Sequence, residues 1–168
     1  MPVRVIGMIG VAPPAGGATV HIIKGGISPS YLKSYAQAHD DAGFDLALVG
    51  YTASSAEGFL VALHAAARTE RLGYLIAHRP GFVAPTLMAR KIATFDHLTE
   101  GRIALHIISG ASDAEQEGDG DFAPKDVRYR RAAEYIEVMK LAWSSRKRFD
   151  FEALFLPKTH FDGYRAAK

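Results

Sequence analysis

Apolar and polar positions fall into blocks that predict alternating strands and helices. Four short aliphatic runs predict buried strands, at residues 3–9, 46–49, 72–77 and 103–108. Apolar residues at helical spacing predict helices between and after them, at about 30–42, 55–67, 85–100 and 126–143. Because parallel neighbours need crossover connections, these strand–helix units predict a parallel sheet with helices packed on its faces.

Capping residues and apolar stripes predict where the helices begin and which side they bury. Ser28 followed by Pro29 predicts the start of the first helix, and Gly43 its end. Ser54 and Ser55 predict the N-cap of the second helix. The aliphatic run 46–49 predicts a strand buried on both faces. The predicted inner stripes are Tyr31, Tyr35, Ala38 and Ala42 on the first helix, Ala84, Met88, Ile92 and Phe95 on the third, and Ala132, Ile136, Met139 and Trp143 on the last.

Two architectures fit this order of elements. A doubly wound, flavodoxin-like sheet is complete at this length. A closed eight-stranded barrel takes about 250 residues, so a chain of 168 residues would supply about half of one. The periodicity alone leaves both architectures open.

Composition narrows the class of protein. With 48% hydrophobic residues, 23% charged residues and a net charge of +2, the chain resembles one soluble globular domain rather than a nucleic-acid binder. No cysteine occurs, which excludes disulfides, thiolate zinc sites and cysteine nucleophiles and favours a reducing, cytoplasmic location. No apolar run approaches the roughly 18 residues of a membrane span, and we expect no membrane partner.

The chemistry-bearing residues gather where predicted strands end. Tyr51 and Thr52 follow the second strand, His78 and Arg79 the third, and His106 and Ser109 lie in and after the fourth. Ligands of β/α folds bind at this end of the sheet, so these positions predict a shared pocket. A histidine at a single strand end is nevertheless more often a hydrogen-bonded structural residue than a catalyst.

Charged residues further along the chain have two interpretations each. Asp119 and Asp121 are turn carboxylates rather than metal ligands, because they lack a clear third ligand, and we expect no metal site. Arg128 and Tyr129 have donors for an anion, but Arg128, Arg130 and Arg131 equally fit a solvated helix face.

An ordered set of motifs resembles the bacterial-luciferase-like, flavin-dependent monooxygenases, with the alkanesulfonate monooxygenase branch closest. The motifs are Ile76–Arg102, Leu105–Gly110, Gly118–Asp121 and Arg128–Arg130, within a resemblance that covers about residues 3–152. This resemblance implies an α/β fold, the N-terminal half (about four β/α units) of a luciferase-like TIM (β/α)8 barrel at residues 1–148. Residues 149–168 are expected to form a divergent tail of a truncated or frame-shifted gene product.

The resemblance also implies an enzyme and its reaction. Reduced FMN, supplied by a separate flavin reductase, would use dioxygen to oxygenate a small organic substrate. If that substrate is an alkanesulfonate, the products are an aldehyde and sulfite. An F420-dependent oxidoreductase of the same fold, or a non-catalytic remnant or subunit, are the alternatives. We further expect a homo-oligomer.

Site residues follow from position against the family pattern, and no catalytic residue is identified. His106 and Ser109 stand where many members have Asn and Thr, and Ser54 and Ser55 stand near a substrate-pocket cysteine of the alkanesulfonate enzymes. The expected flavin contacts are Ala77, His78, His106, Ser109 and Tyr129. The expected substrate pocket comprises Tyr51, Thr52, Ser54 and Ser55.

Overall fold

The computed structural model describes residues 3–14, 26–156 and 159–161, which form two compact units. Unit 1 comprises the residues up to His78 together with Thr99–His106. Unit 2 comprises Arg79–Leu98 and the residues from Ile107 onward. The predicted alternation of strands and helices is confirmed from residue 6 to residue 107.

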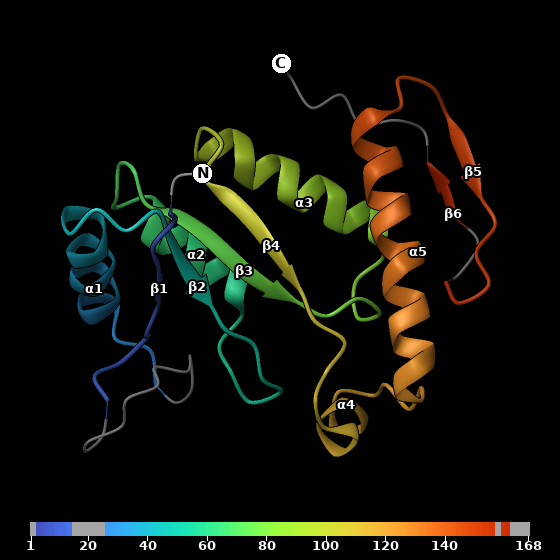
Figure 1. Cartoon of the computed structure of the whole chain (residues 1–168), viewed down its shortest axis with the longest axis horizontal. Coiled ribbons are helices and arrows are strands. Elements are labelled where there is room, and N and C mark those ends of the chain that lie inside the picture. Colours follow the sequence, from blue (N-terminus) through green and yellow to red (C-terminus); the bar gives the residue numbers. More distant parts are fainter. Residues whose placement is uncertain (1–2, 15–25, 157–158, 162–168) are drawn as a thin grey trace. The chain divides into compact units, whose positions relative to one another are not determined.

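A four-stranded sheet forms the centre of unit 1 (Figure 1). Its strands lie in chain order: β1 (Ile6–Met8), β2 (Leu46–Val49), β3 (Gly73–His78) and β4 (Ile103–Ile107). β1 pairs with β2, and β2 with β3, in parallel. The arrow of β4 points the same way as that of β3 in Figure 1. The predicted parallel α/β fold is therefore confirmed.

One face of this sheet is covered by the helices α1 (Pro29–Asp41) and α2 (Gly58–Ala66). Gly7 approaches the ring of His39 on α1 so closely that a Cβ would overlap it. On α2, a Cβ at Gly58 would lie 3.5 Å from both Val49 and Ile76. We call this side the helix face, and its strand residues Ala47, Val49, Tyr74 and Ile76 are fully buried.

The opposite side, which we call the inner face, is less protected. The Tyr74 amide donates to the Arg102 carbonyl at 3.0 Å, so in a parallel ladder Ala104 is level with Leu75, and His106 with Ala77. The prediction that residues 46–49 are buried on both faces is wrong, because Leu46 and Leu48 stay partly exposed on this side. The inner face comprises Ile6, Met8, Leu46, Leu48, Leu75, Ala77, Ala104 and His106.

Local signals placed α1 correctly but not its buried side. Ser28 caps the helix through a hydrogen bond from the Tyr31 amide, and Gly43 ends it with a φ of +76°, as predicted. The stripe predicted from Tyr31 and Tyr35 is wrong, since these rings stack on each other outside the buried stripe, with centroids 5.3 Å apart. The buried side chains are Leu32, Ala36, His39 and Asp40.

Asp40 is one reason why the buried side of α1 differs from the predicted stripe. Its carboxylate accepts hydrogen bonds from the backbone amides of Glu70, Arg71 and Leu72, at 2.8–3.1 Å. Burial would raise the pKa of Asp40, but these hydrogen bonds and the nearby charge of Arg71 together lower it. The polar residue is therefore buried because it fastens the segment that leads into β3.

Unit 2 is helical with one small hairpin (Figure 1). Its elements are α3 (Pro85–Leu98), α4 (Asp113–Gly118), α5 (Lys125–Ser144), β5 (Phe149–Phe151) and β6 (Thr159–Phe161). The pattern predicted α3 and α5 but neither α4 nor the hairpin. Phe95, Met88 and Ile92 are buried on α3 as predicted, whereas Ala84 is exposed.

The predicted stripe of α5 is half right. Ala132 and Met139 are buried, but Tyr135 and Val138 take the places expected for Ile136 and Trp143. The Trp143 side chain is 46% exposed because its Nε1 reaches the Ala89 carbonyl of α3 at 3.0 Å, at the edge of the α3–α5 contact. Within the described ranges, no helix combines the length and apolar character that a membrane span requires.

Candidate functional site

The strand-end residues of unit 1 divide between the two faces of the sheet. Ala77 and His106 are level on the inner face, where the His106 side chain is exposed and Ala77 is buried. His78 lies on the helix face, buried, with its ring edge-on to Phe59 of α2 at 6.1 Å between centroids. The structure therefore brings Ala77 and His106 together, and it directs His78 toward α2.

The segment after β2 forms a tight turn. The Ser55 hydroxyl donates to the Thr52 carbonyl at 2.7 Å and accepts from the Thr52 amide at 2.9 Å. Glu57, rather than Ser54 or Ser55, caps α2 by accepting from the Leu60 amide, so the predicted cap is wrong. Ser55 thus closes the turn, while Ser54 is exposed next to the Thr52 hydroxyl, 3.4 Å away.

Buried arginines organise unit 2 around the segment that follows β4. Arg128 is 3% exposed, and its guanidinium donates to the carbonyls of Ser109 and Ala123 at 2.9 and 2.7 Å and to the Asp113 carboxylate at 2.7 Å. The interpretation of Arg128 as part of a solvated helix face is therefore wrong. Five donors in a planar fork suit this task of fixing a loop to the start of a helix.

Two further arginines form ion pairs with carboxylates of residues 115–121, in the segment that follows β4. Arg79 pairs with Glu115 at 2.7 Å and with Asp119 at 3.5 Å, and Arg131 pairs with Asp121. Burial would raise the pKa of Asp121, but the hydrogen bonds from Arg131 and from the Ala123 amide, together with the charges of Arg131 and Arg128, lower it. Among the described residues, no group of three metal-ligating side chains comes together.

Tyr129 is one of several accessible side chains at the start of α5. It is 59% exposed between the engaged Arg128 and Arg130, whose guanidinium lies 5.9 Å from the centre of the Phe155 ring. Ser109 is half-buried, and its carbonyl is taken by Arg128. Tyr129 and Ser109 both belong to unit 2.

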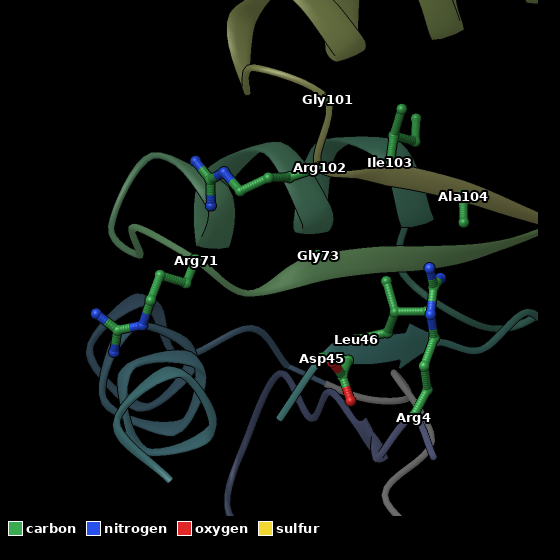
Figure 2. Close-up of a pocket in the computed structure, with 9 residues that line it drawn as sticks. All are labelled: Arg4, Asp45, Leu46, Arg71, Gly73, Gly101, Arg102, Ile103 and Ala104. Carbon is green, nitrogen blue, oxygen red and sulfur yellow. The ribbon is translucent and has the colours of Figure 1, made fainter. Parts of the chain in front are cut away.

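A pocket of about 280 Å³ lies at the opposite, N-terminal end of the sheet in unit 1 (Figure 2). Ligands of β/α folds bind at the C-terminal ends of strands, so its position does not match the predicted pocket. It is lined by Arg4, Asp45, Leu46, Arg71, Gly73, Gly101, Arg102, Ile103 and Ala104.

The hydrogen bonds of Arg102 give this pocket a structural role. Its guanidinium donates to the Ala66, Leu72 and Thr99 carbonyls and to the Thr69 hydroxyl, at 2.9–3.2 Å. In Figure 2 the Arg102 side chain runs away from Leu46. Because Arg102 closes the end of α2, we favour the C-terminal strand ends as the candidate site.

Sequence reasoning missed the apolar lining of that site. Met8, Leu48, Leu75 and Ala104 form one row across the inner face, below Ala77 and His106. Such residues carry no chemical motif, and the uniformly apolar run of β2 gives no sequence signal for which of its residues lie on this face.

Comparisons with known proteins agree on the fold. A family model described as luciferase-like monooxygenase matches residues 8–166, which includes most of the segment 149–168. The oxygenating constituent of 3,6-diketocamphane monooxygenase from the CAM plasmid of Pseudomonas putida, solved with FMN, superposes with a TM-score of 0.76 at 19% identity over 94% of this chain and 44% of that one.

Two further solved structures extend the range of relatives. An F420-dependent secondary alcohol dehydrogenase gives a TM-score of 0.75 at 18% identity, over 98% of this chain and 48% of that one. The EDTA monooxygenase of Chelativorans sp. BNC1 gives 0.62 at 23% identity, over 71% and 31%. The chain thus spans less than half the length of these solved structures. Since the family model covers nearly the whole sequence, the chain belongs to the luciferase-like monooxygenase family.

Proposed function

We propose that the chain contributes to a flavin-dependent monooxygenase that uses FMN and dioxygen on a small organic substrate. The observation that carries this proposal is the placement of Ala77 and His106, level with each other on the inner face at the C-terminal ends of β3 and β4. Reduced FMN from a separate flavin reductase supplies the oxidation chemistry when it is bound.

The residues of unit 1 fit a planar, largely apolar ring. Leu75 and Leu48 offer an apolar surface, Ala77 is small enough to let a ring approach, and His106 provides a hydrogen-bonding group beside it. His78 is a weaker candidate for a direct contact, because its side chain is buried against Phe59 on the helix face.

Unit 2 carries a separate part of the proposal. The exposed phenol of Tyr129 is a hydrogen-bond donor suited to a phosphate, and the neighbouring Arg128 holds the chain around Ser109 in place. We keep Ser109 and Tyr129 as flavin contacts, each to be tested by its own variant.

The substrate is proposed as a small organic molecule held near Tyr51, Thr52 and Ser54. Ser55 is assigned to closing the turn, since its hydroxyl already makes two hydrogen bonds with Thr52. An alkanesulfonate, giving aldehyde and sulfite, remains the narrower form of this proposal. The cysteine-free sequence supports a reducing compartment, the cytoplasm, as its location.

An F420-dependent oxidoreductase is the second candidate. It is favoured by the TM-score of 0.75 and the 98% coverage of this chain in the comparison with the F420-dependent secondary alcohol dehydrogenase. The two candidates differ in the cofactor that the same strand ends would bind.

A fluorescence titration with FMN, reduced FMN and F420 separates them. We expect FMN in one of its redox states to bind more tightly than F420. The variant His106→Ala should weaken binding about fivefold, the equivalent of one lost hydrogen bond of about 1 kcal/mol. The control His97→Ala removes an exposed imidazole of α3 and should leave binding unchanged. Preferential binding of F420, or no response to either cofactor, contradicts the FMN proposal.

A further inference from the structure

The inner face is an apolar sheet surface that stays partly exposed, among the described residues, along the row below the buried Ala77. Met8, Leu48, Leu75 and Ala104 form a continuous row on it, and each is partly exposed. The residues next to them in sequence on β2 and β3, such as Val49 and Ile76, are fully buried on the helix face. A surface of this composition is normally packed against another layer.

β1 and β4 are the edge strands of the sheet, and each pairs with one neighbouring strand among the described residues. Among the described residues, β1 has β2 as its neighbour, and β4 has β3. Since Arg102 and Ala104 direct their backbone groups toward β3, the amides and carbonyls of Ile103 and Leu105 point to the free edge of β4. Free edges of this kind are templates for pairing with a further strand.

We propose that a second copy of this chain covers the inner face and pairs with both edges, giving a closed barrel of two four-stranded halves. A two-fold axis along the barrel places β4 of each copy beside β1 of the other with the same strand direction. All strands then remain parallel, and both edges of each copy are paired in one closed assembly.

The side chains of the two edges are suited to such a seam. Within the apolar row, β4 presents the small Ala104 and β1 the larger Met8, so large and small groups would alternate around the interior. Val3 and Val5, which lead into β1, are 88% and 49% exposed and would be covered by the added strand. An even offset between the strands keeps Ile6 and Met8 inside.

The size of related folds agrees with this arrangement. The chain covers 44% and 48% of two solved structures on which it superposes with TM-scores of 0.76 and 0.75. Two copies therefore supply about the amount of chain that one such fold contains. A different pairing, β4 with β4 of the second copy, would run antiparallel and leave both inner faces open, so it is not favoured.

Closure would complete the candidate site. Each copy supplies the strand ends that carry Ala77 and His106, and the partner copy supplies the rest of the rim. The proposal itself rests on the sheet and its edges, independently of the cofactor. A closed dimer that binds no flavin would contradict the proposed function and leave this inference intact.

Light scattering coupled to size exclusion tests the proposal on the 168-residue chain. We expect twice the monomer mass of 18.2 kDa, independent of loading concentration above the dissociation constant. The variant Leu105→Pro removes an amide that points to the free edge and should yield monomers. The matched control Leu105→Val keeps the amide and should remain a dimer. A monomeric parent chain, masses that grow steadily with concentration, or an unchanged mass in Leu105→Pro overturns the proposal.

A second pair of variants tests the interface without a proline, in case Leu105→Pro does not fold. Ala104→Glu places a charge on the inner face and should give a folded monomer, verified by its circular dichroism. Lys33→Glu introduces the same residue at an exposed position of α1 and should remain a dimer. If Ala104→Glu is as dimeric as Lys33→Glu, the inner face is not the interface.

Discussion

The two faces of the sheet in unit 1 are built from the same strands, but their side chains are buried to different extents. On the helix face, Ala47, Val49, Tyr74 and Ile76 are fully buried beneath α1 and α2. On the inner face, Leu48 and Leu75 stay partly exposed although they are as apolar. The difference shows that burial here depends on the covering layer rather than on residue type.

This contrast also separates stability from function. The helix face holds the polar anchors that fix unit 1, among them Asp40 and the Tyr74–Thr69 hydrogen bond of 2.9 Å. The inner face holds the exposed His106, which the proposed function needs to be accessible, level with the buried Ala77. Substitutions on the two faces should therefore differ in what they disturb.

The largest effect is expected from a matched pair of adjacent residues, tested in the Leu105→Pro background where the inner face stays open. Ile76→Ala should lower the free energy of unfolding by about 3 kcal/mol, because it leaves a cavity under α2. Leu75→Ala should cost less than about 1 kcal/mol, since that side chain is already partly exposed. Urea unfolding measures both, and equal losses would contradict the assignment of faces.

A methyl group added on the helix face should have the next largest effect. Gly7→Ala would overlap the ring of His39 and approach Phe44 at 3.0 Å, which should cost about 2 kcal/mol. Gly50 follows β2, and a Cβ added there would meet no atom within 4 Å, so Gly50→Ala serves as the control. Thermal melting compares the two, and a Gly7→Ala variant as stable as Gly50→Ala would show that α1 lies further from the sheet.

Acid should weaken the helix face through Asp40. Because its pKa is lowered in the folded state from the usual 3.8, the unfolded chain takes up a proton more readily. The stabilisation is present above that value and is lost as the pH falls below about 4. Asp40→Asn should flatten this part of the stability profile, whereas Asp41→Asn, exposed on the same turn, should not. Urea midpoints as a function of pH provide the measurement, and parallel profiles for parent and Asp40→Asn would refute it.

The smallest effect is expected from one hydroxyl group. Tyr74→Phe removes the hydrogen bond to Thr69 but keeps the ring in its buried position, which should cost about 1 kcal/mol. Tyr31→Phe changes the same atom on a half-buried ring of α1 and should be nearly neutral. Denaturation curves for the two variants should differ by this amount, and a neutral Tyr74→Phe would indicate that water replaces Thr69.

Residue periodicity predicted β2, β3 and the start of α1, because short apolar runs and Ser28–Pro29 are local signals. It could not predict that Leu48 would be exposed, since that depends on a layer which local sequence does not encode. The burial of Arg128 was likewise missed, because its partners at Ser109, Asp113 and Ala123 come from another segment. For the site, the chain order predicted Ala77 and His106 near each other, but the direction of His78 depends on α2.

Thiol labelling tests the difference between the faces most directly, because the chain has no cysteine of its own. Leu48→Cys and Val49→Cys place single thiols on adjacent residues of β2, on opposite faces. In the Leu105→Pro background, we expect rapid labelling at position 48 and strong protection at position 49. Equal labelling rates at the two positions, or faster labelling at 49, would contradict the assignment of an open inner face and a covered helix face.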